Sequence, residues 1–426
     1  MANAGIAGDP WPVVVVGAGA AGMTAALFAG RAGARVLLLE TRPRPGAKIR
    51  VSGGGRCNVL PAAAASDDFH TSGSQHALRN ILLSWPLDRV RAFFEHDLGI
   101  PLKTEPTGKI FPVSERPQDV VDALLGACAG SGVVLAGGFR AADVRQLPAS
   151  APAGPAARFE IHSADGHIVR AATLVLATGG LSLPKSGSDG GGLEIVRRLG
   201  VAMVPTYPAL VPLLAADRRW QALAGVSVRA QLRAVRDNKM LEERDRELLV
   251  THRGFSGPVV LDMSRHVTAG DGVRLLVRWG GAAAPDWETA LRPAGNRQVA
   301  TLLRGHLPDR LAERLLELAE VPSERRESEL TRAERGRLVD VLERWPLPVS
   351  GNEGYATAEA TGGGVALGAV HTRTLECRAV PGLFLCGEML DVVGRIGGYN
   401  FLWAWASGRK AGQAAAAAAL VTGAAR

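Results

Sequence analysis

The first residues in the chain that could do chemistry are the glycines at positions 17, 19 and 22, spaced as Gly-x-Gly-x-x-Gly. In this spacing the first glycine permits a tight turn, the second lets the backbone approach a pyrophosphate, and the third lets a helix pack closely on a strand. The N–H groups at the start of that helix attract the phosphates. Glu40 ends the next apolar run, where a carboxylate can accept the hydroxyls of a ribose. The spacing predicts a dinucleotide site.

The elements around this turn fit one βαβ unit. Residues 13–16 are a run of valines, typical of a strand buried in a parallel sheet. Residues 20–32 favour a helix of small residues, and residues 35–39 a second buried strand. Elements of the same style are expected later: a helix at 117–129, a strand at 133–135, a β-hairpin of 158–161 with 168–171, a strand at 173–177 and a closing helix from about 401.

The middle of the chain differs from both ends. Four strands are expected there, at 230–234, 247–250, 259–263 and 273–279. A helical period follows from 286 to 343, with a helix at 309–320 as its clearest member. We therefore expect an α/β fold: a discontinuous, Rossmann-like nucleotide-binding domain at 1–200 and 355–426, interrupted by an inserted domain at 201–354. That insertion is strand-rich over 205–283 and helical over 285–350.

Two later patterns favour FAD over NAD as the dinucleotide. Thr178, Gly179 and Gly180 follow the strand at 173–177, as a small-residue turn beside the cofactor does in flavoproteins. Residues 382–388 form a strand that ends in glycine and an acid, the pattern that reaches the ribityl chain in glutathione-reductase-like flavoproteins. No second Gly-x-Gly-x-x-Gly occurs downstream, so NAD(P)H is expected only as a transient electron donor.

Two glycine-rich runs could border the flavin ring. In residues 51–58, Val-Ser-Gly-Gly-Gly-Arg-Cys-Asn, three glycines let the backbone lie flat against a ring, and Arg56 with Lys48 offers charge to phosphate or substrate. Cys57 has no partner cysteine nearby, which favours a packing role over a redox one. Residues 397–400 precede the last helix, whose positive end would stabilise an anionic reduced flavin. The alternative is an ordinary helix start with Asn400 as its N-cap.

The runs at 48–58, 109–114, 251–258, 361–365 and 387–400 together resemble the BaiN-like (YhiN-like) family of bacterial FAD-dependent oxidoreductases, also labelled the aminoacetone oxidase family. The resemblance spans nearly the whole chain. It implies a glutathione-reductase-type FAD-binding domain with an inserted distorted β-barrel and helical bundle. The chain departs from the family at Lys109, where an arginine is usual, at Asp189, which is followed by three glycines where one is more usual, and at Phe401, where a leucine is usual.

The patterns and the resemblance together give a set of expected site residues. The residues expected to bind FAD are Gly17, Gly19, Ala20, Ala21, Gly22, Glu40, Thr41, Arg42, Lys48, Ser52, Gly53, Gly54, Gly55, Arg56, Cys57, Asn58, Thr178, Gly179, Gly180, Gly387, Glu388, Asp391, Gly398, Tyr399, Asn400 and Phe401. His252, Arg395 and Tyr399 are the candidates for catalysis or substrate contact. His252 could equally be a loop histidine bonded across the domain junction. No metal site is expected.

The net charge of +8 raises the question of nucleic acid. The basic residues are scattered, no basic block is interleaved with aromatics, and only 5% of residues are aromatic, which argues against such a partner. None of the four cysteines forms a Cys-x-x-Cys pair, which suits a reducing cytoplasm, and no leader or membrane span is expected.

We therefore expect a cytoplasmic enzyme that moves hydride between flavin N5 and a small organic substrate. Whether it is an NAD(P)H-dependent reductase or an amine oxidase stays open, as does its oligomeric state. The alternatives are an FAD-dependent tRNA-modifying or RNA-binding flavoprotein and a non-catalytic FAD-binding regulator.

Overall fold

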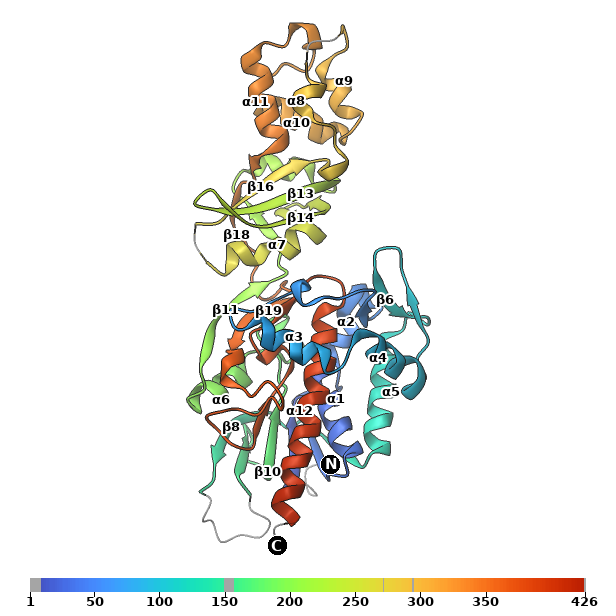
Figure 1. Cartoon of the computed structure of the whole chain (residues 1–426), viewed down its shortest axis with the longest axis vertical. Coiled ribbons are helices and arrows are strands. Elements are labelled where there is room, and N and C mark those ends of the chain that lie inside the picture. The colour runs from blue at the N-terminus through green and yellow to red at the C-terminus, as the bar shows by residue number, and fades with distance from the viewer. Residues whose placement is uncertain (1–8, 149–156, 271, 293–294, 425–426) are drawn as a thin grey trace. The chain divides into compact units, whose positions relative to one another are not determined.

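The computed structural model describes residues 9–148, 157–270, 272–292 and 295–424 (Figure 1). It divides into two compact units: unit 1 is Met1–Thr206 with Ala360–Arg426, and unit 2 is Tyr207–Glu359. The chain leaves unit 1 and later returns to it, so unit 1 is discontinuous. Whether these units are independent domains with boundaries near 200 and 355 stays a prediction.

The core of unit 1 is a seven-stranded sheet of order β7-β2-β1-β10-β9-β8, in which β20 also pairs with β10. The strands β1, β2, β7, β10 and β20 run parallel, whereas β9 and β8 add an antiparallel edge. Their bounds are β1 Trp11–Val16, β2 Val36–Glu40, β7 Val133–Gly137, β8 Ala141–Gln146, β9 Phe159–Ser163, β10 Ile168–Leu176 and β20 Leu383–Leu385. The expected hairpin is confirmed, but its second arm and the strand expected at 173–177 are one strand, β10. The first part of β10 (168–171) pairs antiparallel with β9, and the part from Ala171 to Leu176 pairs parallel with β1 on the other side of β10.

Helices cover this sheet (Figure 1). The expected helices are confirmed as α1 (Ala20–Arg31), α5 (Pro117–Gly130) and α12 (Tyr399–Ala424). Two glycines of α12 allow it to touch the backbone of α1: a Cβ built on Gly408 would lie 2.4 Å from the Ala21 carbonyl oxygen, and one on Gly412 would lie 2.1 Å from that of Ala25. This backbone contact fixes the start of α12 relative to the glycine turn before α1.

The smaller elements of unit 1 complete the surroundings of the sheet. They are α2 (Ala47–Gly55), α3 (Gln75–Leu83), α4 (Leu87–Ala92), α6 (Gly191–Arg198), β3 (Leu60–Pro61), β4 (Phe69–His70), β5 (Leu102–Thr104), β6 (Lys109–Pro112), β19 (Ala360–Val365) and β21 (Val393–Gly394). Strands β3, β6 and β5 form one small sheet, and β21 pairs with β4. Strand β11 (Met203–Ala209), at the border between the units, pairs with β19.

Unit 2 holds an antiparallel sheet and a group of helices. The strand order is β17-β16-β13-β14-β15-β12-β18, and the fully buried Trp220 and Trp279 stack with ring centroids 5.7 Å apart. The bounds are β12 Leu213–Ala215, β13 Ser227–Arg236, β14 Lys239–Val250, β15 Gly254–Ser256, β16 Arg274–Trp279, β17 Trp345–Pro346, β18 Val349–Asn352, α7 Pro258–Thr268, α8 Trp287–Ala290, α9 Val299–Arg304, α10 Asp309–Leu318 and α11 Arg332–Glu343.

The strand expected at 259–263 is wrong, because these residues lie in α7. Gly257 has φ +86°, a turn conformation that suits glycine, and Pro258 occupies the first helical position, where its missing N–H costs nothing. Val259, Val260 and Met263 are buried at helical spacing. In the described part of the chain, no helix combines the length and apolar character needed to cross a membrane.

Candidate functional site

The glycine turn between β1 and α1 has the geometry that a pyrophosphate requires. Gly17 has φ +102°, and a Cβ on Gly22 would lie 1.7 Å from the Gly17 carbonyl oxygen, so helix and turn touch through backbone alone. A Cβ on Gly19, by contrast, would meet nothing within 4 Å. The middle glycine therefore leaves an open face at the N-terminus of α1, where Ala20 and Ala21 form the first turn.

Glu40 ends β2 beside this turn. Its Oε2 accepts a hydrogen bond from the Ala18 N–H at 2.7 Å, and its Oε1 accepts one from the Arg42 N–H at 2.8 Å. The two bonds hold the partly exposed carboxylate in place while each oxygen keeps a lone pair for a ribose hydroxyl. Thr41, between them, is exposed.

The run Ser52–Asn58 departs from helical geometry at the end of α2. Gly53, Gly54 and Gly55 have φ of +58°, +69° and +80°, and a Cβ on Gly54 or Gly55 would meet nothing within 4 Å. Ser52 closes the loop through its carbonyl oxygen, which accepts the Cys57 N–H at 3.0 Å. Three exposed glycines thus present bare backbone, as expected for a surface that a flat ring can cover.

Two side chains of this run, those of Arg56 and Cys57, interact within the protein. Arg56 bonds Glu105 at 2.6 Å and lies over the Phe111 ring with its guanidinium carbon 4.2 Å from the centroid. Its charge is therefore matched within the protein. Cys57 is fully buried, and burial raises the pKa of its thiol to about 12. A thiol that stays protonated at neutral pH is a poor nucleophile, which leaves Cys57 a packing and backbone role.

A polar network joins α2 to the segment after β20. The Lys48 ammonium donates to Glu388 Oε2 at 2.5 Å and to Ser182 Oγ at 2.8 Å. Ser182 Oγ donates to Glu388 Oε1 at 2.6 Å, and the Thr361 N–H donates to the same oxygen at 2.9 Å. The structure thus brings together Lys48 and Glu388, which the sequence placed in the site, with Ser182 and Thr361, which it did not. No local pattern marks Ser182, and Thr361 lies in the 361–365 run that resembles the family.

The turns around this network are built on small residues. Gly179 has φ +78°, and a Cβ on it would lie 2.6 Å from Ser188 Oγ, while a Cβ on Gly180 would lie 2.4 Å from Thr361 Oγ1. Thr178 Oγ1 donates to the Met389 sulfur at 3.3 Å. Ser188 is buried, and its hydroxyl has no hydrogen-bond partner among the described residues. An unpaired buried hydroxyl beside Gly179 is a donor that a bound ligand can satisfy.

Gly387 and Asp391 serve the fold directly. A Cβ on Gly387 (φ +69°) would lie 2.7 Å from the Ala21 Cβ, so this glycine brings the segment against α1. The buried Asp391 accepts hydrogen bonds from the Ser72 N–H at 2.9 Å and the Thr71 hydroxyl at 3.3 Å. These contacts occupy one oxygen of Asp391, and its contact with FAD stays a prediction.

The start of α12 is tied to the Ser52–Asn58 run. With its amide oriented to satisfy both ends, Asn58 accepts the Gly398 N–H at 3.0 Å and donates to Leu60 and Ile110. The first bond inside the helix runs from the Leu402 N–H to the Gly398 carbonyl, and Asn400 bonds both backbone groups of Gly394. The alternative of Asn400 as the N-cap is therefore wrong, because Asn400 lies within the first turn. Phe401 stacks on Trp405 at 5.5 Å.

The candidate catalytic residues fall into both units. In unit 1, Arg395 bonds Asp68 at 2.7 Å and lies 5.8 Å from the Tyr399 ring centroid, and that ring packs edge-on against Phe69. In unit 2, His252 is exposed in the turn between β14 and β15. Arg395 and Tyr399 are thus neighbours at the start of α12, while the roles of all three residues stay predictions.

The donor set suits FAD. An open glycine turn with a helix N-terminus faces phosphate, an anchored carboxylate follows for ribose, and bare glycine backbone adjoins a second helix N-terminus for the ring. Among the described residues there is no group of three or more His, Cys, Asp or Glu side chains that could hold a metal ion.

Comparisons with known proteins identify the family of this chain. The family model described as the HI0933-like protein Rossmann domain matches residues 11–414. The chain is 36% identical over 411 residues to a ribosomal RNA dihydrouridine synthase of Escherichia coli (strain K12), covering 94% of this chain and 96% of that protein. It is 34% identical over 415 residues to a 3-dehydro-bile acid delta(4,6)-reductase of Clostridium scindens, covering 94% and 98%.

A solved structure shows the same fold. The open conformation of a flavocytochrome c3 fumarate reductase superposes with a TM-score of 0.50 at 17% identity, covering 98% of this chain and 80% of that one. The fold is thus that of FAD-binding oxidoreductases with a glutathione-reductase-type domain. Because the family model spans nearly all of the sequence and two relatives match over more than nine-tenths of it, the chain belongs to the HI0933-like family and is an FAD-dependent oxidoreductase.

Proposed function

We propose that this FAD-dependent oxidoreductase reduces a carbon–carbon double bond conjugated to a carbonyl group, and that its substrate is a uracil base of RNA. One structural observation supports the flavin-site part of the proposal: Asn58, at the end of the open glycine run, holds the Gly398 N–H at the start of α12 at 3.0 Å. The two surfaces expected to border the flavin ring are therefore fixed to each other within unit 1.

The choice of bond follows from the chemistry that the names of two relatives share. Dihydrouridine is uridine with two hydrogens added across a ring double bond, and a delta(4,6)-reductase acts on ring double bonds. In uracil that bond is conjugated to a carbonyl, so a hydride can add to the far carbon while negative charge moves toward the carbonyl oxygen. A proton then completes the reduction at the near carbon. The reacting bond in both substrate classes is thus a ring carbon–carbon double bond.

The protein's own residues have defined tasks in this scheme. FAD, when bound, supplies the hydride, and NAD(P)H is the proposed source of its electrons. The positive end of α12 stabilises negative charge that develops in front of it. Tyr399 is the proposed proton donor, and Arg395 holds the Tyr399 ring from one side.

RNA is preferred to a steroid for two reasons. The relatives named for ribosomal RNA are 36% and 30% identical to this chain, and they come from two organisms. The charge is also uneven: unit 1 holds 26 basic and 19 acidic residues, whereas unit 2 holds 23 and 22. A basic unit attracts a polyanion. The sequence alone argued against nucleic acid because its basic residues are not consecutive; charges distant in sequence can still gather in space. A steroid-type enone remains the second candidate because of the 34% relative.

The test is a reduction assay on the purified, FAD-loaded protein. Under anaerobic conditions with NADPH or NADH, a ribosomal RNA fragment should gain two hydrogens at a uridine, detected by mass spectrometry of its nucleosides. A 3-oxo steroid with conjugated double bonds is assayed in parallel by loss of its ultraviolet absorption. Reduction of the steroid alone would replace RNA as the substrate. A flavin that both nicotinamides reduce, with neither substrate changed, would contradict the proposed reaction.

A cytoplasmic location, which the unpaired cysteines favour, is part of this proposal.

A further inference from the structure

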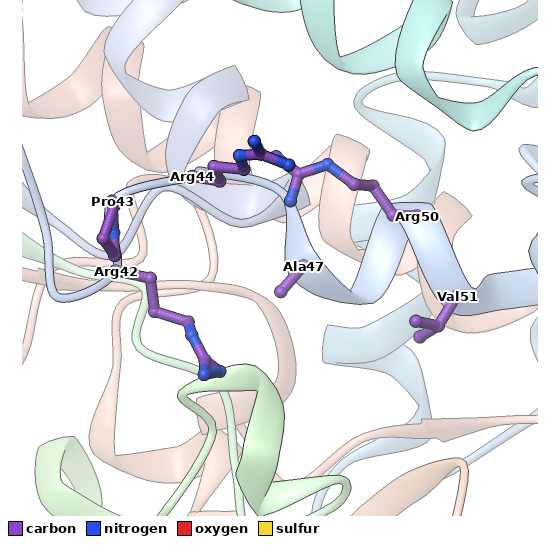
Figure 2. Close-up of a pocket in the computed structure, with 6 residues that line it drawn as sticks. All are labelled: Arg42, Pro43, Arg44, Ala47, Arg50 and Val51. Carbon is purple, nitrogen blue, oxygen red and sulfur yellow. The ribbon is translucent and has the colours of Figure 1, made fainter.

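A hollow of about 430 Å³ lies beside the glycine run, at the start of α2 (Figure 2). Its lining is Arg42, Pro43, Arg44, Ala47, Arg50 and Val51. Three of these six residues are arginines and none is acidic. In Figure 2 the side chains of Arg44 and Arg50 extend toward one another, while that of Arg42 points away from them. Arg44 and Arg50, six positions apart in the sequence, thus bring two positive charges to one side of the hollow.

The charge of this hollow is not matched by the protein. Among the described residues, no carboxylate forms an ion pair with Arg42, Arg44 or Arg50. Arg56, Arg170 and Arg395 of the same unit, by contrast, each pair with an acid. Arg50 is held instead by neutral acceptors: its Nε donates to Gln118 Oε1 at 3.0 Å, and its guanidinium also donates to the Pro45 carbonyl. These bonds orient the guanidinium and leave its full charge available.

At the other two arginines it is the backbone that is constrained. Arg42 is anchored through its N–H to the Glu40 carboxylate, and its side chain passes over Gly187, where a built Cβ would lie 3.6 Å from the Arg42 Cδ. Arg44 stands between Pro43 and Pro45, whose rings fix their own φ and stiffen the segment. Two guanidiniums that extend toward one another repel unless an anion lies between them, so the arrangement favours an anionic ligand.

FAD does not account for this charge. Its two phosphates have the glycine turn and the N-terminus of α1, and its ribose has Glu40. No further anion of FAD is left for Arg44 and Arg50. Both side chains are also outside the set that the sequence assigns to FAD.

We propose that the Arg44–Arg50 side of this hollow binds a phosphate group, and that the phosphate belongs to the RNA strand whose base is reduced. The source of the phosphate rests on the proposed function; the phosphate chemistry rests on the two guanidiniums. The shape suits a phosphodiester, because paired guanidiniums bind its two free oxygens without requiring a particular base. The hollow would thus orient the strand and leave the choice of base to the flavin site.

The test compares RNA binding by the FAD-loaded full chain and by its variant Arg44→Gln/Arg50→Gln. A labelled ribosomal RNA fragment is titrated by fluorescence anisotropy at several salt concentrations. We expect about tenfold weaker binding at low salt, and a slope of log affinity against log salt that falls by about one. The matched control is Arg145→Gln/Arg170→Gln, which removes the same charge from exposed positions on β8 and β10 of the same unit. The control should keep both the affinity and the slope.

Separate measurements distinguish the alternatives. Flavin absorbance per protein should be equal in the wild type and the variant; a loss of FAD would assign the hollow to the cofactor and overturn the proposal. Equal RNA affinity in the wild type and the variant, or an equal loss in the control, would also overturn it. If the variant raises the KM for NADPH but not for NADH and keeps its RNA affinity, the phosphate is that of NADPH and RNA is excluded as the source. Reduction of free uridine, scored separately, reports on the proposed reaction whether or not the hollow binds RNA.

Discussion

The ammonium group of Lys48 lies 2.5 Å from Oε2 of Glu388, although the two residues are 340 positions apart in the sequence. Burial raises the pKa of the Glu388 carboxyl, but the Lys48 charge and the hydrogen bonds from Lys48, Ser182 and Thr361 outweigh this, so its pKa is below the ordinary value. The pair joins α2 to the segment after β20. It therefore couples two parts of the candidate FAD site that the chain order keeps apart.

Replacing Lys48 should destabilise the protein, because the Glu388 carboxylate would lose its cationic partner. In Lys48→Met, Glu388 stays partly buried without its cation, and we expect a loss of about 1–3 kcal/mol in the free energy of unfolding at pH 7. Because the folded pKa of Glu388 is below the unfolded value of about 4.3, the stabilisation is complete above that pH and is lost as the pH falls through the folded pKa. The gap between wild type and variant in urea unfolding should therefore shrink from pH 7 to below about pH 4.

The exposed Lys185 supplies the control for this experiment. Lys185→Met removes the same charge from unit 1 and should change the unfolding free energy by less than about 0.5 kcal/mol at either pH. A gap for Lys48→Met that is constant between pH 7 and pH 3 would show that the loss is one of packing and not of the ion pair.

The parts of the fold that the sequence predicted are those set by local pattern. The valine run of β1 contains no polar residue, so composition alone predicts that it is buried in a parallel sheet. The strand expected at 259–263 was wrong because its local pattern was ambiguous. A short apolar run fits a strand as well as a helix, and the turn at Gly257 with Pro258 after it decided the outcome. The length and composition of the run do not distinguish the two structures, because they do not include the turn that precedes it.

In the Gly17–Gly22 turn, the roles of Gly19 and Gly22 can be distinguished by experiment. Gly19 has φ −85° and ψ −169°, which any residue adopts, and a Cβ there is unobstructed. Gly19→Ala should fold normally but bind FAD at least about tenfold more weakly, because the methyl group occupies the open face. Gly22→Ala places a Cβ 1.7 Å from the Gly17 carbonyl oxygen and should lower the unfolding free energy by about 3 kcal/mol or more.

Both variants are compared by thermal unfolding and by FAD titration of the stripped protein. The exposed Gly126 of α5 gives the control, since Gly126→Ala adds a methyl group in open space and should stabilise the helix by about 0.5–1 kcal/mol. If Gly19→Ala retained wild-type FAD affinity, the pyrophosphate would not lie at this turn.

The candidate site was predicted as a set of segments but not as a set of contacts. The sequence placed Arg56 near phosphate or substrate because of its charge; the structure pairs it with Glu105, which is 49 positions away. Asn58 and Gly398 were both expected in the site, yet nothing in the sequence indicates that one bonds the other. The partner of a side chain depends on which distant segments pack together, and this cannot be predicted from local spacing in the sequence.

Unit 2 offers a test of stability that is separate from the FAD site. Glu242 on β14 bonds His266 at 2.7 Å and Arg244 at 2.6 Å, and also pairs with Arg265. Burial raises the pKa of the Glu242 carboxyl, but the His266 hydrogen bond and the two arginine charges outweigh it and lower the pKa to about 2. Glu242→Gln should lower the unfolding free energy at pH 7 by about 3 kcal/mol.

This stabilisation has a defined pH window. It is fully present above about pH 4.3, the unfolded value, and is lost as the pH falls toward 2. Glu243→Gln, at the neighbouring and more exposed position paired with Arg233, should cost less than about 1 kcal/mol. Urea unfolding followed by tryptophan fluorescence at pH 7 and pH 3 measures both. A smaller effect for Glu242→Gln than for Glu243→Gln at pH 7 would contradict the assignment.

Tyr399 gives the sharpest test of the proposed chemistry. In Tyr399→Phe the ring can keep its edge-on contact with Phe69, while the proposed proton donor is lost. We expect unchanged FAD content and unchanged reduction by NADPH, with substrate reduction slowed about 10²-fold. Because proton transfer would then limit the rate, the solvent deuterium isotope effect on substrate reduction should rise above that of the wild type. Tyr355→Phe, in unit 2, is the control and should leave the rate unchanged. If Tyr399→Phe reduced its substrate at the wild-type rate with an unchanged isotope effect, Tyr399 would not be the proton donor.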